Sequence, residues 1–110
     1  MIIKTVKVKS DKTEKEYELD IFINISSMKM AEREIKKDYP KLTFITALPY
    51  LETEIIIMTS IIGSCCHLKN SVQALGTEWF DREYIDFIKY KADLIDAISE
   101  CADDLKSTKK

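Results

Sequence analysis

The sequence predicts an α+β fold in which an N-terminal β-hairpin precedes three α-helices, the last two of them long and amphipathic. Three observations lead to this prediction. Apolar and polar residues alternate over much of the first 25 residues, which is typical of strands with one buried face. Apolar residues recur at intervals of three and four in the later segments, as on one side of a helix. Tyr39-Pro40 and Gly76-Thr77 interrupt the helical pattern.

The 110 residues, 45% of them apolar, fit a single domain over 1–110, because a chain of this length buries about two-thirds of its unfolded surface on folding. We divide it into a hairpin over 1–25, a helical layer over 26–105 and a frayed tail over 106–110. The most apolar run, Ile55 to Ile62, is far shorter than the roughly 18 to 20 residues of a membrane span. We therefore expect this run to belong to the core.

The second strand is the most clearly marked element. All odd positions from Tyr17 to Ile25 are apolar, while the even positions are mostly Glu, Asp and Asn, so one face should be buried. Ile2 to Lys9 predicts the first strand, and the polar stretch from Ser10 to Glu14 suits a loop longer than two residues. The lysines of the first strand could then face the acids of the second.

A first helix is expected between Ser26 and Tyr39. Ser26 or Ser27 can accept hydrogen bonds from its first free amides. Pro40 should end it, because proline disfavours helical geometry at the preceding residue. The apolar stripe on its inner face consists of Met28, Ala31 and Ile35.

The second helix is predicted from about Tyr50 to Lys69, with Pro49 at its first turn. The form of the apolar connection over 42–48 stays open. The β-branched run within this segment could also be a buried strand. A helical stripe longer than a normal strand favours a helix: Leu51, Ile55, Met58, Ile62 and Cys65/Cys66.

The third helix is predicted from Arg82 to about Leu105, and Thr77 or Asp81 could cap a helix start just before it. Its apolar residues repeat at spacings near three and four, which makes it long and amphipathic. These residues include Tyr84, Ile88, Ile95, Ile98, Ala102 and Leu105.

Cys65-Cys66-His67, together with Cys101, supplies the ligand types of a zinc site. Adjacent helical residues point about 100° apart, so Cys65 and Cys66 could not both reach one ion. We therefore expect three free cysteines that pack as small apolar groups, with no metal and no cofactor. His67 is the only histidine, and no evident third group would orient it for nucleophilic catalysis. A position at a helix end, near the C-terminal dipole, is the simpler account.

Acidic residues are frequent in the last third of the chain, and we expect them to be solvated surface charges: Asp81, Glu83, Asp86, Asp93 and Asp96. A net charge of −2 disfavours nucleic acid as a partner. With no phosphate-cradling glycine loop and no catalytic constellation, the protein is predicted not to be an enzyme. The free thiols and the lack of a signal segment predict a cytoplasmic location.

Trp79, Phe80, Tyr84 and Phe87 form an aromatic group. Such a group is most often core. If it is partly exposed, it would be the best protein-binding anchor in this chain, because Trp and Tyr dominate interface energetics.

Several short motifs occur in a particular order. They are Ala31–Ile35 with Tyr39-Pro40, then Tyr50–Glu54 leading to Met58, then Leu75–Phe80 before the acidic last helix. This order resembles the small tail assembly chaperones of long-tailed bacteriophages, over residues 26–105. The resemblance implies a non-enzymatic protein of the host cell cytoplasm that coats the tape measure protein, recruits tail tube subunits and is absent from the finished virion. It also implies that a longer frameshifted product can exist.

A chaperone for a long apolar helix needs an apolar groove, and copies aligned along a client would need to self-associate. We expect a homo-oligomer whose partner-binding residues are Met28, Met30, Tyr39, Met58, Trp79, Phe80, Tyr84 and Phe87. The alternative function is a small inhibitor or sponge that binds a host defence protein or a small ligand. An acidic exposed face from Asp81 to Asp104 would support that alternative. An enzyme that uses Cys65, Cys66 or His67 is a third and weaker option.

Overall fold

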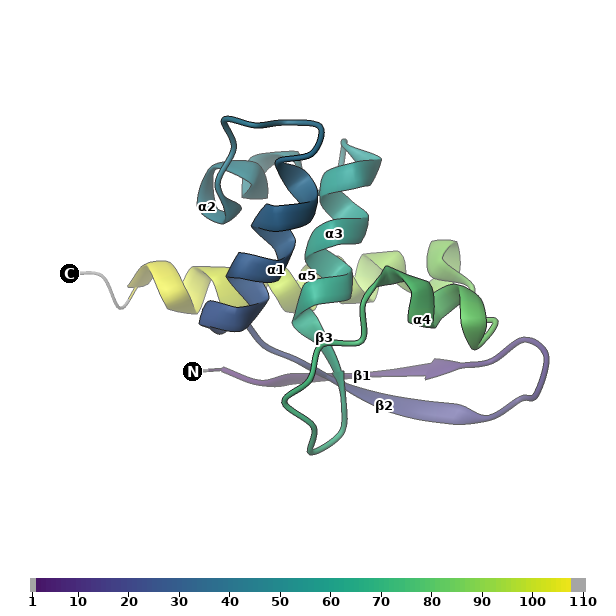
Figure 1. Ribbon diagram of the computed structural model, residues 1–110. Helices are drawn as coiled ribbons and strands as arrows, with labels where there is room; N and C mark the ends of the chain where they lie inside the picture. The colour runs from purple at the N-terminus through teal and green to yellow at the C-terminus, as the bar shows by residue number, and fades with distance from the viewer. Residues whose placement is uncertain (1, 108–110) are drawn as a thin grey trace.

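A three-stranded antiparallel sheet packs beneath a layer of helices (Figure 1). The computed structural model describes the backbone of residues 2–107 and the side chains of residues 2–105. The strands are β1 (Lys4–Lys9), β2 (Glu16–Ile21) and β3 (Cys66–Leu68), in the spatial order β1-β2-β3. This arrangement confirms the predicted α+β class and the N-terminal hairpin.

The hairpin has the predicted alternation. Val6 lies opposite Leu19, and both face the helices, whereas Lys7 lies opposite Glu18 and Lys9 opposite Glu16 on the other face. Lys7 and Lys9 of β1 therefore face acids of β2, as predicted, whereas Lys4 lies opposite Ile21 and pairs with Glu100 of α5. Exposed pairs of this kind favour one register but contribute only a few tenths of a kcal/mol.

The strand ends earlier than its alternation predicted. β2 stops at Ile21, and the helix α1 (Ile25–Ile35) already begins at Ile25, whose side chain is exposed. Asn24 caps this helix, since its Oδ1 accepts hydrogen bonds from the amide of Ser27 at 2.8 Å and from the Ser27 hydroxyl at 3.0 Å. The prediction that Ser26 or Ser27 is the cap was therefore wrong. The short Asn24 side chain is an equally good acceptor just before the first turn.

α1 lies beside α3 (Ile55–Cys65), as Figure 1 shows, and it ends at Ile35, well before Pro40. The connection whose form was left open contains the short helix α2 (Phe44–Ala47) and the 3₁₀ turn η1 (Leu48–Tyr50). Pro49 lies in η1, so its predicted place in the first turn of the long second helix was wrong. Proline suits this 3₁₀ turn for the same reason, since its missing amide hydrogen needs no partner at a helix start.

α3 is a helix, as favoured over the strand alternative, but it is much shorter than predicted. It begins at Ile55 and gives way at Cys66 to β3, which pairs with β2 through Leu68 opposite Leu19 and Cys66 opposite Ile21. The helical spacing of apolar residues continues past Cys66, so this spacing alone does not reveal the end of the helix. Pairing with a distant strand decides the change of conformation, and a short sequence window does not contain that information.

The last predicted helix begins five residues later than expected, at Phe87, and a separate short helix precedes it. α4 (Thr77–Arg82) and α5 (Phe87–Ser107) are separated by a sharp turn at residues 83–86. Neither Thr77 nor Asp81 caps α4, whose N-cap position is Gly76, while Asp86 Oδ1 accepts from the amide of Ile88 at 3.1 Å at the start of α5. α5 is long and amphipathic, as predicted. Of the tail predicted to fray, residues 106 and 107 continue α5, and residues 108–110 lie outside the described residues.

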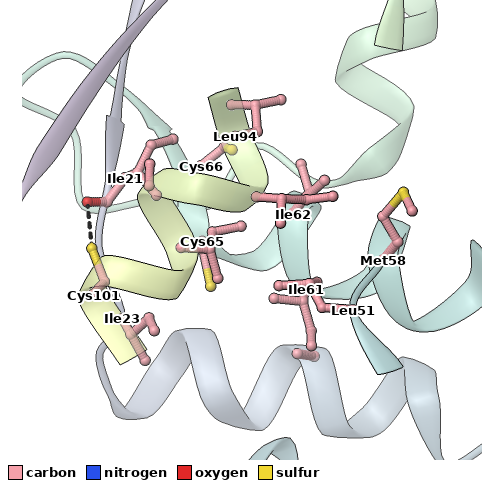
Figure 2. Close-up of a cluster of buried hydrophobic side chains, with 14 of the residues drawn as sticks. Ile21, Ile23, Leu51, Met58, Ile61, Ile62, Cys65, Cys66, Leu94 and Cys101 are labelled. Carbon is pink, nitrogen blue, oxygen red and sulfur yellow. Dashed lines mark hydrogen bonds between the residues drawn. The ribbon is translucent and has the colours of Figure 1, made fainter. Parts of the chain in front are cut away.

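The core lies where α3 and α5 meet the inner face of the sheet. Figure 2 shows side chains from β2, α3 and α5 gathered between these elements, with the thiol of Cys101 on α5 donating to the carbonyl oxygen of Ile21 at 3.5 Å. Ile61, Ile62 and Leu94 are completely enclosed there. Over residues 2–107, no helix is both long enough and apolar enough to cross a membrane.

Candidate protein-binding site

The first turn of α3 presents two apolar side chains that the described part of the chain leaves partly uncovered. α3 is apolar on all sides, and Ile57 and Ile61 are fully buried. Ile55 and Ile56, in contrast, are 62% and 37% exposed. A helix that is apolar all round is normally enclosed on all sides. The first turn of α3 is therefore an exposed surface of a kind that binding partners cover.

An open hollow of about 490 Å³ borders this turn, between α3 and the segment that follows α1. Tyr50 of η1, 47% exposed, stands at its edge. The wall is mainly apolar. Its lining residues are Asp38, Tyr39, Pro40, Lys41, Leu42, Tyr50, Glu54 and Ile57. We call this hollow, together with Ile55 and Ile56, the α3 surface.

A hydrogen bond holds one wall of the hollow in place. The hydroxyl of Tyr39 donates to Glu54 Oε1 at 3.0 Å, and the amide of Tyr39 donates to the carbonyl oxygen of Ile35 at 2.8 Å. The hydrogen bond to Glu54 is the main cause that raises the pKa of Tyr39 above its ordinary value. The ring is thus fixed against the start of α3, which preserves the open shape of the hollow.

A second, smaller hollow of about 210 Å³ lies between the start of α3 and the middle of α5. Met58, Ala92 and Ile95 form its apolar part, and Glu52, Lys91 and Asp96 complete the lining. The N-terminal part of α3 therefore borders two hollows.

Three of the predicted partner-binding residues lie inside the core: Met58, Trp79 and Phe80. Trp79 makes edge-to-face contacts with Tyr17 and Phe80, with ring centroids 5.0 Å and 5.1 Å apart. Phe87 packs edge-on against Phe80 and is half-buried. In this conformation, Trp79 and Phe80 contribute to stability and offer no surface to a partner.

The remaining predicted residues are dispersed. Met28 is half-buried on α1, and Met30 borders a separate hollow of about 360 Å³ between α1, α3 and the start of α4. Tyr39 lines the α3 surface, while Tyr84 is exposed at the turn between α4 and α5. The structure therefore does not bring the eight residues together.

Sequence reasoning missed Tyr50, Ile55 and Ile56 as surface residues. Ile55 and Ile56 were missed because the run from Ile55 to Ile62 was predicted to be core. The sequence did contain one signal of this exposure, namely that the helix is apolar on every side. A domain of this size has too little protein to enclose every face of such a helix near its end.

Cys65, Cys66 and Cys101 are free and buried, as predicted for cysteines that pack as small apolar groups. Burial raises the pKa of all three thiols, so they are protonated at neutral pH. Within residues 2–107, no cluster of three or more His, Cys, Asp or Glu side chains could hold a metal ion.

The prediction that His67 lies at a helix end was wrong. His67 lies in the middle of β3. Its ring is buried and stacks on Phe22, with the ring centroids 3.7 Å apart, and Nδ1 lies 3.3 Å from the carbonyl oxygen of Asp20. The change from helix to strand at Cys66 is the cause, because it moves His67 from the axis of α3 onto the sheet. Burial lowers the pKa of His67, although the carbonyl of Asp20 acts in the opposite direction.

This environment predicts a stability that falls with acidity. The unfolded chain binds a proton at His67 below pH 6.5, whereas the folded chain does so only at a lower pH. The neutral ring therefore contributes stability that is complete above pH 6.5 and is lost as the pH falls through the folded pKa. Urea unfolding between pH 7 and pH 5 should show this decline. His67→Gln should abolish this decline in the upper part of the pH range. A variant whose stability falls with pH as that of the wild type does would contradict this role of His67.

The acidic residues are surface charges, as predicted. Asp81, Asp86, Asp93 and Asp96 are exposed. Glu83 is half-buried, and its Oε1 accepts a hydrogen bond from the Tyr17 hydroxyl at 2.6 Å.

Comparisons with protein-family models, with curated protein sequences and with solved structures find no significant match to this chain.

Proposed function

We propose that this protein acts by binding an apolar segment of another polypeptide on the α3 surface. The observation that carries the proposal is the uncovered first turn of a helix that is otherwise enclosed. Leaving Ile55 and Ile56 in water forgoes the gain from their burial, which is about 25 cal/mol for each Å² of apolar surface. A partner that covers these side chains recovers that free energy.

The charges at the edge of the hollow favour an apolar occupant over a strongly charged one. Asp38 and Glu54 are acidic and Lys41 is basic, so no field of one sign covers the opening. Ile55 and Ile56 offer an exposed apolar turn, and the hollow, which is lined by Glu54 and Ile57 of the same stretch, offers a groove. An amphipathic helix binds such a surface by inserting apolar side chains spaced three and four residues apart.

For the identity of the partner we rely on the resemblance of the motifs to phage tail assembly chaperones. We propose that the client is a tape measure protein, a long helical polypeptide whose apolar side chains need cover before the tail tube forms around it. Recruitment of tail tube subunits is the second part of this proposed role.

Co-expression with the tape measure protein of the same locus tests the proposal. We expect the client to be soluble and to be recovered in complex with this chain. A client that is soluble without this chain bound to it would contradict the proposal.

The double substitution Ile55→Ser/Ile56→Ser should weaken client binding at least tenfold while leaving the fold intact, because both side chains are exposed in the free chain. Isothermal titration calorimetry with a client peptide measures the change. Val72→Ser is the control, since Val72 is 83% exposed, lies in the loop that follows β3 and is not part of the α3 surface. Equal binding by the double variant and the wild type would exclude the α3 surface.

A comparison of Ile55→Ser/Ile56→Ser with the wild type also tests whether a second copy of this chain covers the α3 surface. We expect light scattering of the free chain to give the same mass for Ile55→Ser/Ile56→Ser and for the wild type. A wild-type dimer that dissociates on this substitution would show that the α3 surface is the dimer interface, and it would overturn the client proposal.

A second candidate function is inhibition of a host protein by an acidic face. The observation that favours it is the exposure of five aspartates on α4, on α5 and in the turn between them: Asp81, Asp86, Asp93, Asp96 and Asp103. Binding through such a face would fall steeply with added salt, whereas binding through the α3 surface would not. The salt dependence of a complex therefore separates the two candidates.

A further inference from the structure

The hollow that borders Met30, about 360 Å³ in volume, lies over a side of α3 that carries small residues. Ser60, Gly63 and Ser64 are three and four positions apart, so they lie together on the helix and form the floor of the hollow. α1 and α4 lie on either side of α3 (Figure 1), and they contribute the walls. The volume is within the range of small-molecule sites, about 300 to 1,000 Å³. We call it the Ser60 hollow.

The hydroxyl of Ser60 has no partner within the described part of the chain. Ser60 is only 9% exposed, yet no hydrogen bond joins its Oγ to another described residue. The neighbouring hydroxyls of α3 are bonded, since Thr59 donates to the carbonyl oxygen of Ile55 at 3.0 Å and Ser64 donates to that of Ser60 at 2.7 Å.

This unbonded oxygen opens on the hollow. Among the described residues, every side-chain oxygen or nitrogen that is fully enclosed has a hydrogen-bond partner. Oγ of Ser60 has none, so it is not sealed within the core, and Ser60 lines the hollow. A buried hydroxyl without a partner is costly, and a ligand that supplies the missing hydrogen bond removes this cost.

Hydrogen bonds to α3 fix the wall that leads into α4. The amide of Gly76 donates to the carbonyl oxygen of Gly63 at 2.8 Å, and the hydroxyl of Thr77 donates to that of Thr59 at 3.0 Å. The hollow therefore has its shape before any ligand binds. A site formed in advance spares the ligand the cost of ordering it.

The charged groups at the rim have both signs. Glu34 of α1 lies 3.0 Å from Lys37, and Arg82 of α4 lies 3.9 Å from Glu83. Glu78 forms no ion pair with another described residue. The two pairs are open to solvent and hold these side chains only weakly. Because the charges nearly balance, the rim gives a strongly charged ligand no advantage, whereas a ligand that carries one charge of each sign finds a partner for both.

We propose that the Ser60 hollow binds a small zwitterion of the dipeptide class. The ammonium group of the ligand lies between the carboxylates of Glu34 and Glu78. Its carboxylate lies against the guanidinium of Arg82, and its peptide carbonyl accepts a hydrogen bond from the Ser60 hydroxyl. This site is separate from the α3 surface, and neither proposal depends on the other.

Glycyl-leucine with free ends is the probe, because its leucine side chain can pack on Met30 and Leu75, which are half-buried in the lining. Added to the full chain labelled with ¹⁵N, it should cause saturable shifts of the amide signals at residues 60–64 and 75–82. The N-acetylated and C-amidated forms each lack one charge and should bind at least fivefold more weakly. An absence of saturable shifts, shifts confined to other residues, or equal binding of the three forms would overturn the proposal.

Ser60→Ala should have two separate effects. The affinity for glycyl-leucine should fall at least threefold, because the hydrogen bond to the ligand is lost. The melting temperature should stay the same or rise, since the hydroxyl is unbonded in the free chain and alanine favours a helix. Ser99→Ala, at an exposed position of α5, should leave the affinity unchanged. Wild-type affinity in Ser60→Ala, or a lower melting temperature, would contradict the assigned role of this hydroxyl.

The contribution of charge is tested with two matched variants. Arg82→Gln should weaken binding at least threefold. Arg33→Gln removes the same charge from an exposed position of α1 outside the hollow and should change the affinity less than twofold. Equal losses in both would show attraction by net charge alone and contradict a defined site. Ile55→Ser/Ile56→Ser should bind glycyl-leucine normally, so the two proposals can fail independently.

Discussion

Ile98→Ala is expected to lower the free energy of unfolding by about 2 to 5 kcal/mol, the range for truncating a fully enclosed Ile or Leu. Ile98 on α5 has no exposed surface. Its removal leaves a cavity where α5 packs against the rest of the core, and only partial collapse can fill it. Urea unfolding followed by circular dichroism measures the loss. A domain of this size has a total stability of about 5 to 15 kcal/mol, so a substantial unfolded fraction is expected on mild heating.

Ile88→Ala is the matched control, because it makes the same change in the same helix at an exposed position. It should alter the stability by less than about 0.5 kcal/mol. A similar loss from both variants would mean that α5 is not packed against the core as described.

Gly63→Ala should destabilise the protein by about 1 to 3 kcal/mol, the usual cost of overpacking. A methyl group at Gly63 would lie 2.6 Å from the amide nitrogen of Thr77 and 2.9 Å from its Oγ1. The first of these atoms belongs to the backbone and cannot rotate away. The hydrogen bonds from the amide of Gly76 to the carbonyl of Gly63 (2.8 Å) and from the Thr77 hydroxyl to the carbonyl of Thr59 (3.0 Å) would be disturbed as well.

The sign of this effect is the informative result. In a free helix, replacing glycine by alanine stabilises by about 1 kcal/mol. A loss of stability therefore reports the close approach of residues 76–77 to α3, and a gain would show that the approach is absent. Ser99→Ala, at an exposed position of α5, gives the effect of adding alanine to a helix without that contact.

Ile55 and Ile56 are exposed in the free chain, where they are less favourable than they would be beneath a covering partner. Sites at which local rules are broken without a packing gain are where function is expected.

Regular patterns in the sequence were sufficient for several elements. The alternation from Tyr17 onward predicted β2 and its buried face, and the spacing of apolar residues after Arg82 predicted the long amphipathic α5. The adjacency of Cys65 and Cys66 argued correctly for thiols that pack in the core. The candidate site was predicted less well, since Tyr39 is the only one of the eight predicted partner-binding residues that lines the α3 surface.

What the sequence determined by itself was local: the hairpin, the helical character of the apolar run, and the amphipathic last helix, all of which follow from the period of apolar side chains along a short stretch. The tertiary structure decided three further features. These are the change from α3 to β3 at Cys66, the burial of the Trp79-Phe80 pair, and the exposure of Ile55 and Ile56. The physical reason is the same in each case. Strand pairing and solvent exposure depend on which distant segment lies alongside a residue, and an apolar side chain reads the same in the sequence whether another element covers it or not.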